Sequence, residues 1–315
     1  MRHLKPVCVI GSIVYDFVMN LPRFPSVGET VLGHKFSTFI GGKGLNQAVQ
    51  IHRLGAPISF WGRVGNDRLG KEAIETLSAQ GFDISGIRVV DGDQTAVAMI
   101  YVVPGGVNMI GGVPTANMNF RIDEIDARME NAIKSASILS LQLEIPDCIN
   151  ERALILAKAA GVPTLLNAAP YRNLPAFYNE LVDYWVVNEI EAGQFFNCSI
   201  ARSSECESMC CRPEINNGRQ TWVVTLGDRG AAVVDSLGVW DIPGISVDAV
   251  DSTGAGDSFT GGFAVGVAEG LSPVQAAQFA NTVAALSVTK LGGMTGLPTR
   301  QEVIEKFRAP ARPSH

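Results

Sequence analysis

The sequence predicts an α/β protein whose central, mostly parallel sheet is covered by helices on both faces. Short apolar runs with the character of buried strands alternate along the chain with segments of helical periodicity, such as residues 152–160. Such alternation is typical of parallel sheets, in which each helix returns the chain to start the next strand. The chain has 315 residues, enough for one large α/β domain or two smaller ones.

Composition agrees with a globular protein and argues against both disorder and a nucleic-acid partner. Hydrophobic residues make up 46% of the chain and charged residues 18%, which is inconsistent with disorder. The formal net charge is −6, and no basic stripe is present to release counterions from phosphates. We therefore expect no nucleic-acid partner.

The first buried strand is predicted at Val7–Ile10. Arg2, His3 and Lys5 precede this apolar stretch as they would in a signal peptide, but Asp16 interrupts it and no small-residue cleavage site follows. No uncharged apolar run reaches the ~18 residues needed to span a bilayer. We therefore expect no membrane partner, a cytoplasmic location and six reduced cysteines.

Further strands are predicted along the rest of the chain. Five of them have the character of buried strands: 58–61, Ile138–Gln142, Thr164–Asn167, 184–187 and 222–225. Two more segments, 31–39 and 95–103, have strand character without an intervening core helix. No internal repeat or low-complexity linker divides the chain, so a single domain over residues 1–315 is expected. Residues 308–315, rich in Pro and Arg, are expected to form a flexible tail.

The segment most informative about function is 251–262, with the sequence DSTGAGDSFTGG. Gly254 and Gly256 allow positive φ and close approach to a ligand, so that N–H groups at the start of the following helix point at phosphate oxygens. Asp257 lies in the first helical turn, where the helix dipole favours its charged form and keeps it able to accept a proton. The pattern indicates an anion site with a base beside it. Taken alone, it also fits a glycine turn whose aspartate only complements the dipole.

A second glycine-rich segment, 41–48 (GGKGLNQA), precedes a helical pattern that stops at Gly55. It is not a nucleotide P-loop, because Gly44 follows Lys43 where Ser or Thr is required. The glycines instead offer bare backbone beside Lys43 and Asn46, a cation and an amide able to hold hydroxyl groups. A helix-entry turn with a solvated lysine is the alternative.

Together these two segments and their flanking sequence resemble the ribokinase-like family of carbohydrate kinases, also called the phosphofructokinase B family. The resemblance covers nearly the whole chain. Seven further motifs follow in the family's order: 11–16 (GSIVYD), 25–30 (PSVGET), 65–70 (GNDRLG), 141–144 (LQLE), 167–170 (NAAP), 188–191 (NEIE) and 225–230 (TLGDRG). The resemblance implies a three-layer Rossmann-like fold with a small β-sheet lid from about residues 12–40 and 93–118. Such lids often pair two subunits, so a homodimer through the lid is expected.

The resemblance also implies the reaction. The γ-phosphoryl group of ATP would pass to a primary hydroxyl of a pentose such as ribose, or of a related sugar. Asp257 would take the hydroxyl proton, and the N–H groups of Gly254, Ala255 and Gly256 would form an anion hole for the developing charge. A nucleoside kinase of the same superfamily and a non-catalytic sugar or nucleotide sensor stay open as alternatives. The intact Asp257 argues against the sensor.

The sugar side of the site is implied by a matching set of positions. The positions that hold hydroxyl groups in the family are matched here by Asp16, Gly42, Lys43, Asn46, Glu144 and Asp257. Alone, Asp16 would be a turn residue after the first strand, and Glu144 a solvated strand end. The chain departs from the family at Val14, where ribokinases have an asparagine. Because valine makes no side-chain hydrogen bond, we expect less discrimination in favour of one sugar hydroxyl. The acceptor therefore stays open among ribose, a deoxy sugar, another pentose, a hexose and a nucleoside.

The nucleotide side is implied in the same way. Asn188 and Glu191 match the element that organises Mg²⁺ in the family, commonly through water, although a helix capping box is the alternative. The positions expected to flank the nucleotide are Asn188, Thr225, Gly227, Asp228 and Gly230. Residues 227–230 also fit an ordinary hairpin turn.

Potassium activation is a further implication of the resemblance. Asp251 matches the side-chain ligand, and Thr253 and carbonyls from Val288 to Gly293 are further candidates. Gly296 stands where ribokinases have a serine ligand. In the alternative, Asp251 only anchors the turn by accepting backbone N–H bonds.

Cys206, Cys210 and Cys211 form a local cluster in the part of the chain least like the family. Zinc would require more ligands, and no histidine lies nearby, so a metal site is not expected there.

Overall fold

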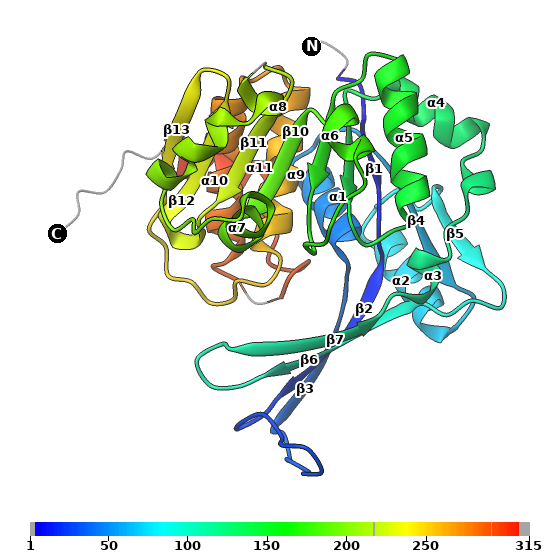
Figure 1. The fold of residues 1–315 in the computed structure, drawn as a ribbon. Helices are drawn as coiled ribbons and strands as arrows, with labels where there is room; N and C mark the ends of the chain where they lie inside the picture. Colours follow the sequence, from blue (N-terminus) through cyan, green and yellow to red (C-terminus); the bar gives the residue numbers. More distant parts are fainter. Residues whose placement is uncertain (1–3, 217, 291, 309–315) are drawn as a thin grey trace.

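Strand β1 (Val7–Ile10) shows why the sheet is covered on both faces. All four of its residues are buried; Val7 and Val9 pack into one hydrophobic core, whereas Cys8 and Ile10 pack into the other. Successive side chains of a strand point to opposite faces, so a strand that is apolar at every position needs cover on both sides. A computed structural model describes residues 4–216, 218–290 and 292–308, and its fold is shown in Figure 1.

Within the described residues the large sheet has nine strands. In spatial order they are β13 (Gly238–Pro243), β12 (Gly230–Asp235), β11 (Thr221–Thr225), β10 (Tyr184–Asn188), β9 (Thr164–Asn167), β8 (Ile138–Gln142), β1, β4 (Ile58–Gly65) and β5 (Ile87–Val90). From β11 to β5 all neighbours are parallel, whereas β12 and β13 extend the sheet by antiparallel pairing. The predicted mostly parallel sheet is confirmed.

The predicted strand positions hold, with differences at the ends. Three strands, β1, β8 and β9, have the predicted bounds; β4 continues to Gly65, β10 includes Asn188 and β11 begins at Thr221. Strands β5, β12 and β13 have no counterpart among the predicted strands.

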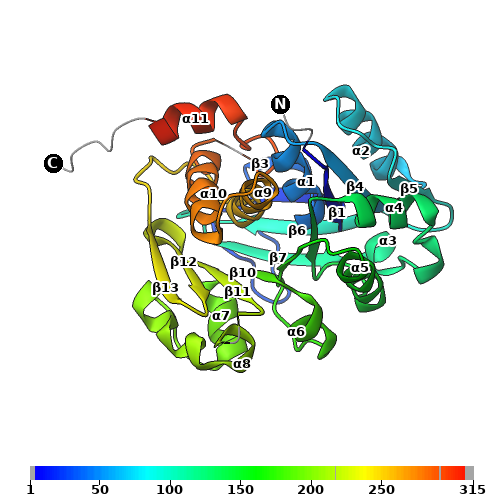
Figure 2. The same cartoon turned by 90° about the horizontal axis from the view of Figure 1, so that it is seen from above.

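Helices form a layer on each face, as Figure 2 shows from above. One layer consists of α1 (Lys43–Arg53), α2 (Arg68–Ala79), α9 (Ala255–Ala268), α10 (Pro273–Ser287) and α11 (Arg300–Arg308). The other consists of α4 (Ala127–Ser135), α5 (Asp147–Ala159), α6 (Phe177–Leu181), α7 (Glu189–Phe196), η2 (Ser203–Cys211) and α8 (Pro213–Asn216). The short elements α3 (Thr115–Met118), η1 (Ile122–Glu124) and η3 (Gly227–Arg229) complete the set. The three-layer architecture is therefore confirmed.

Two predicted boundaries need correction. The helix predicted at 152–160 begins earlier, at Asp147, directly after Pro146, which cannot donate a backbone hydrogen bond and suits a helix start. Arg308, predicted as part of the tail, is the last residue of α11, and residues 309–315 lie outside the described residues. The stop predicted at Gly55 is confirmed, because α1 ends at Arg53 and Gly55 has φ 73°.

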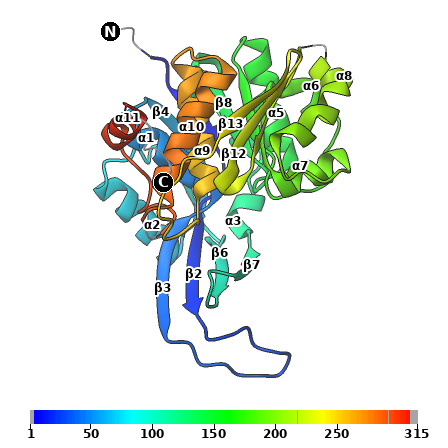
Figure 3. The ribbon, with the colours of Figure 1, turned by 90° about the vertical axis from the view of Figure 1, so that its left-hand side faces the viewer.

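A separate four-stranded sheet projects from the main body (Figure 3). Its order is β3 (Lys35–Gly41), β2 (Val14–Asn20), β6 (Ala96–Val102) and β7 (Asn108–Val113). The strand predicted at 31–39 is wrong at both ends, because pairing with β2 runs from Asn20 opposite Lys35 to Val14 opposite Gly41. Asp16 lies inside β2, so the alternative that placed it in a turn is also wrong. The role of this sheet as a lid stays a prediction.

The predicted cysteine cluster, Cys206, Cys210 and Cys211, lies in η2. All six cysteines are free, and Cys206 is buried, which raises the pKa of its thiol to about 12. Within residues 4–216, 218–290 and 292–308, no group of three or more His, Cys, Asp or Glu side chains is placed to hold a metal ion. None of the described helices has the length and apolar character required to cross a bilayer.

Candidate active site

The predicted site residues gather where the parallel strands of the large sheet end. Glu144 lies two residues after β8, Asn188 ends β10 and Thr225 ends β11. Helix α1 begins at Lys43, and α9 carries Asp257 in its first turn. Ligands of open α/β sheets bind beyond the carboxyl ends of the strands, so this edge is where a site is expected.

The turn before α9 has the geometry of an anion site. Gly254, the N-cap, is left-handed with φ 78°, a conformation that favours glycine. The N–H of Ala255 donates to Ser252 O at 3.2 Å and that of Ser258 to Gly254 O at 2.8 Å. In the described part of the chain, the N–H groups of Gly256 and Asp257 have no protein acceptor. These two donors at a helix N-terminus are therefore available to an anion, whereas that of Ala255 is already engaged.

Asp257 is held by two amides from α1. Its Oδ2 accepts from Asn46 Nδ2 at 2.9 Å and its Oδ1 from Gln47 Nε2 at 3.3 Å, and the residue is only 7% exposed. Burial raises its pKa above the ordinary value; the Lys43 cation and both amides oppose this, and Glu144 adds to it. The helix dipole was expected to favour the charged form of Asp257, but burial has the larger effect and favours the neutral form. A raised pKa makes the carboxylate a stronger base.

Lys43 is the cation at the centre of this cluster. Its burial disfavours the charged form, but the carboxylates of Asp257, Glu144 and Glu191 outweigh this and raise the pKa of its ammonium group. Lys43 is half-buried at the start of α1, so the alternative of a helix-entry lysine stays open beside the predicted role. Lys43 can balance negative charge on Asp257, on Glu144 and on a bound anion.

Two glycines bring Lys43 to this position. Gly42 has φ 95°, and an added Cβ would lie 2.9 Å from both Ser12 O and Val14 N. A Cβ on Gly44 would lie 2.6 Å from the backbone of Gly11. Since real Cβ atoms do not approach so closely, both positions are restricted to glycine by the packing of α1 against the β1–β2 connection. Substrate contact by Gly42 stays a prediction.

Glu144 is anchored rather than solvated, which corrects the alternative stated for it. Its Oε2 accepts from Ser12 Oγ at 2.5 Å and from the backbone N–H of Lys43 at 3.0 Å. These bonds orient the carboxylate and leave Oε1 for a further donor. Asn46 likewise has only one of its amide atoms in a hydrogen bond. Its Nδ2 donates to Asp257, whereas its buried Oδ1 has no partner among the described residues. A buried acceptor without a donor fits a site for a ligand hydroxyl.

Asp16 faces the same cluster from β2. Burial raises its pKa to about 7, and the carboxylates of Glu144 and Asp257 add to the effect. Val14 lies two residues earlier in the strand and therefore on the same face as Asp16.

At the start of α7, Asn188 and Glu191 form a helix capping box, which was the alternative to their predicted role at Mg²⁺. Glu191 N–H donates to Asn188 Oδ1 at 2.7 Å, and Asn188 N–H donates to Glu191 Oε2 at 2.9 Å. Burial raises the pKa of Glu191 against the effects of this bond and of Lys43. The cap uses one carboxylate oxygen, so the predicted metal role of this pair is compatible with it and stays a prediction.

The predicted nucleotide residues divide into two groups. Thr225 ends β11 opposite Asn188, and Gly227 follows two residues later. The connection to antiparallel β12 through η3 confirms the hairpin alternative for 227–230. Gly230 has φ 102°, and a Cβ there would overlap Ile242 O, so packing explains this glycine. The Asp228 side chain is 95% exposed. Asp228 and Gly230 are therefore weaker candidates than Thr225 and Gly227.

The predicted potassium ligands lie around the anion turn. Asp251 Oδ1 accepts from Thr253 N–H and Oδ2 from Gly292 N–H, both at 2.9 Å, so the anchoring alternative is realised. Val288 O already accepts from the N–H groups of Val250 and Asp251. Gly293 packs on Gly254, where an added Cβ would lie 3.3 Å from Gly293 Cα. Potassium binding by Asp251, Thr253, Val288 and Gly293 stays a prediction.

The packing around Gly296 leaves no room for a side chain. A Cβ there would lie 2.8 Å from Gly292 O and 2.9 Å from Ser287 O. A serine at this position would therefore require the loop to move.

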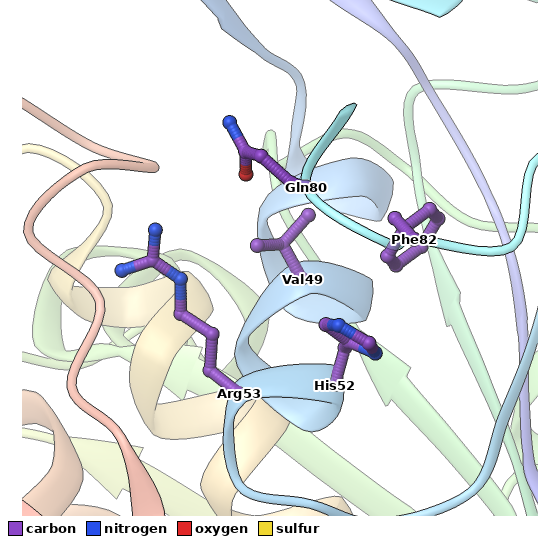
Figure 4. Close-up of a pocket in the computed structure, with 5 residues that line it drawn as sticks. All are labelled: Val49, His52, Arg53, Gln80 and Phe82. Carbon is purple, nitrogen blue, oxygen red and sulfur yellow. The ribbon is translucent and has the colours of Figure 1, made fainter. Parts of the chain in front are cut away.

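A pocket of about 320 Å³ lies elsewhere, at the other end of α1 (Figure 4). It is lined by Val49, His52, Arg53, Gln80 and Phe82. Arg53 is committed, because its Nη1 donates to Leu297 O at 2.7 Å. With a rise of 1.5 Å per residue, this end of the helix is about 15 Å from Lys43. The pocket is therefore separate from the predicted site.

Five polar side chains were missed from the predicted site, and all contact its members or one another. They are Ser12, Gln47, Ser140, Gln142 and Asn167. A signal for two of them was present in the sequence, since Ser140 and Gln142 alternate with leucines in an otherwise apolar strand. Buried polar groups require partners, so their presence in a core strand indicates a polar network.

Comparisons with known proteins agree with this geometry. The pattern of the pfkB family carbohydrate kinases matches residues 4–300. The chain is 35% identical to the ribokinase of Haemophilus influenzae over 302 residues, which cover 96% of this chain and 98% of that protein. It is 30% identical to the deoxyribokinase of Salmonella typhi, over 96% of this chain and 97% of that protein. The structure of Arabidopsis thaliana ribokinase complexed with ribose and ATP superimposes with a TM-score of 0.89 at 30% identity, covering 97% and 99% of the two chains. This chain therefore belongs to the pfkB family of carbohydrate kinases.

Proposed function

We propose that the protein transfers the γ-phosphoryl group of ATP to a primary hydroxyl of ribose or a closely related pentose. The observation that carries this proposal is the placement of Asp257. Its buried carboxylate lies in the first turn of α9, beside free N–H groups of Gly256 and Asp257 and within electrostatic reach of Lys43. A base, an anion site and a cation thus meet at one point, as phosphoryl transfer to an alcohol requires.

Asp257 accepts the proton of the attacking hydroxyl. Phosphoryl transfer proceeds through a loose transition state, so positioning and charge stabilisation contribute more than early proton removal. The turn 254–256 and the start of α9 hold the charge that develops on the phosphoryl oxygens, and Lys43 adds a positive charge beside it. Asp16, Asn46 Oδ1 and Glu144 Oε1 accept the remaining sugar hydroxyls, with Gly42 offering backbone beside them.

Asn188, Thr225 and Gly227 contact the nucleotide at the ends of β10 and β11. Asn188 and Glu191 would hold Mg²⁺, since an oxygen ligand set with few carboxylates suits this hard cation and the cap leaves Oε1 of Glu191 unused. When bound, Mg²⁺ neutralises phosphate charge. K⁺ would bind near Asp251 and the loop that packs on Gly254, where it would steady the anion turn.

The direct test is ADP release from ATP and Mg²⁺ with a panel of pentoses, deoxypentoses, hexoses and nucleosides, with and without K⁺. A pentose that supports turnover, with loss of turnover in Asp257→Ala, is the expected result. Turnover with nucleosides alone would instead identify a nucleoside kinase. ATP binding without turnover on any acceptor would favour a sensor.

Asp16 predicts a pH dependence of sugar affinity. Its pKa of about 7 means that it is largely protonated at pH 6 and ionised at pH 8. A carboxylate accepts stronger hydrogen bonds than a neutral acid, so affinity for ribose should rise about fivefold between pH 6 and pH 8. Titration calorimetry at both pH values measures this. Asp16→Asn is the control; a dependence that persists in this variant would assign it to another group.

Val14 predicts a relaxed preference at one sugar hydroxyl. It shares the face of β2 with Asp16 but offers no hydrogen bond, and the chain is similar to a deoxyribokinase as well as to ribokinases. We expect ribose and 2-deoxyribose to be used with kcat/KM values within about tenfold of each other, and Val14→Asn to increase the preference for ribose by about tenfold. Equal preference in both proteins would show that position 14 does not contact the sugar.

We also propose that two copies pair through the small sheet. The face opposite to Asp16 carries Phe17, Phe36, Met99, Met109 and Val113, as the strand register shows. Phe36, Met99, Met109 and Val113 are exposed large hydrophobic side chains, and such an apolar sheet face is typical of an interface. Light scattering should give a dimer for the native protein and a monomer for Met99→Asp. A native monomer would contradict this proposal. The cytoplasm is the expected location, consistent with six free cysteines.

A further inference from the structure

Gln47 is a fully buried glutamine on α1 whose amide makes four hydrogen bonds. Its Nε2 donates to Asn167 Oδ1 at 3.1 Å and to Asp257 Oδ1 at 3.3 Å. Its Oε1 accepts from Gln142 Nε2 at 2.7 Å and from Ser140 Oγ at 3.3 Å. A glutamine amide has two donor hydrogens and two acceptor positions, so its capacity is completely used.

The backbone determines which way this amide points. Asn167 Nδ2 donates to Val186 O at 3.1 Å, and a carbonyl oxygen can only accept, so Asn167 must present its Oδ1 to Gln47. Two acceptors, Asn167 Oδ1 and the Asp257 carboxylate, therefore face one end of the Gln47 side chain. That end must be the NH₂ group.

The strands β8 and β9 hold the other end of the amide. Ser140 and Gln142 alternate along β8 and project from the same face, toward α1, and Asn167 ends β9. A Cβ on Gly11 would overlap Gln142 Oε1, so the glycine leaves the room that Gln142 occupies. The amide of Gln47 is thus hydrogen-bonded to side chains of two central strands of the sheet, β8 and β9.

Asn46, the other amide on Asp257, is not tied in this way. Its Oδ1 is buried without a partner among the described residues, and we have proposed that a sugar hydroxyl binds there. Asn46 can therefore reorient when the sugar binds or leaves. Among the described residues, only Gln47 connects the Asp257 carboxylate by hydrogen bonds to side chains of β8 and β9.

We propose that Gln47 is a positioning residue for Asp257: its amide, locked by Asn167, Gln142 and Ser140, holds the carboxylate in its productive rotamer and favours its ionised form. This inference rests on the proposed role of Asp257 as the base. It gives Gln47 a function distinct from substrate contact, because every hydrogen-bonding position of its amide is occupied by protein.

The charges around Asp257 decide how much this bond affects ionisation. Lys43 on α1 favours the carboxylate, whereas Glu144 after β8, Asp16 on β2 and Glu191 on α7 oppose it. With three carboxylates against one cation, loss of a neutral donor leaves the ionised form less stable. The pKa of Asp257 should then rise further.

The test compares Gln47→Met with Gln50→Met. Gln50 is also fully buried on α1, one turn later, and its Nε2 donates to Pro298 O at 3.0 Å, away from Asp257. Gln47→Met should lower kcat about 10- to 100-fold with KM for ribose within about twofold. The acidic limb of its kcat profile should move up by about one pH unit. Gln50→Met should leave that limb unchanged, even if its melting temperature falls as much.

Two results would overturn the proposal: an unshifted acidic limb in Gln47→Met, or an equal shift in both variants. A second readout needs no turnover. The carboxyl carbon of Asp257, assigned by its absence in Asp257→Asn, is titrated by NMR in the native protein and in Gln47→Met. An equal pKa in both proteins would show that Gln47 does not tune the base. If the proposed kinase function itself were wrong, the native protein would show no sugar-dependent ADP release. That result is distinct from both outcomes above.

Discussion

Replacing Asp257 by alanine should lower kcat about 10²- to 10⁴-fold, the usual contribution of a general base, while KM for the pentose changes little. The reason is that, in the proposed mechanism, Asp257 contacts the reacting hydroxyl, whereas Asp16, Asn46 and Glu144 provide the other sugar contacts. Steady-state kinetics of ADP release with ribose measures both constants. A large rise in KM with kcat intact would show that Asp257 binds the sugar without acting as the base.

Two further variants make this result interpretable. Asp257→Asn preserves the shape of the side chain, but its NH₂ group would face a donor from Asn46 or Gln47, so it tests charge at some structural cost. Asp241→Asn removes an exposed carboxylate on β13 and should retain native kinetics. Thermal melting of each variant separates loss of the base from loss of the fold.

Replacing Lys43 by methionine should lower kcat/KM at least about 100-fold, comparable to the loss of one oxyanion donor. Methionine has an unbranched side chain of similar length but removes the cation that balances Asp257, Glu144 and Glu191. Without it the pKa of Asp257 rises further, so more of the base is protonated at neutral pH. The activity of the variant should therefore recover partly as pH increases from 6 to 9.

The pH profile of kcat/KM distinguishes this explanation from simple loss of a contact. If Lys43 bound only the sugar, the variant would be weaker at every pH and its acidic limb would not move. Lys43→Arg keeps the charge but replaces a compact ammonium by a planar guanidinium, so it should preserve the position of the limb while lowering kcat/KM. Lys71→Met on the exposed part of α2 is the matched control.

Much of the main body could be predicted because its signals are local. The apolar run of β1 indicates burial on both faces, and Gly55 with its positive φ ends α1 within two residues. The small sheet was harder, since the bounds of β3 follow from its register with β2 and not from its own composition. Register is a property of two segments, which no single-segment pattern contains.

The same distinction applies to the site. Asp257, Lys43 and Gly254 belong to short motifs and were identified from them. Gln47 was missed although it adjoins Asn46 in the sequence, because its partner Asp257 is 210 residues away. The capping box of Asn188 and Glu191 and the anchoring of Asp251 show that the local alternatives were realised, and they leave room for the functional roles.

What the sequence by itself determined is the alternation of strands and helices in the main body, the left-handed turn before α9 and the aspartate in the first turn of that helix. These features depend on propensities and φ values of neighbouring residues. Only the tertiary structure decided the pKa directions of Asp257 and Asp16 and the anchoring of Glu144 by Ser12. Burial and electric fields arise from segments that meet only in the folded chain, and they decide how strongly each group holds its proton.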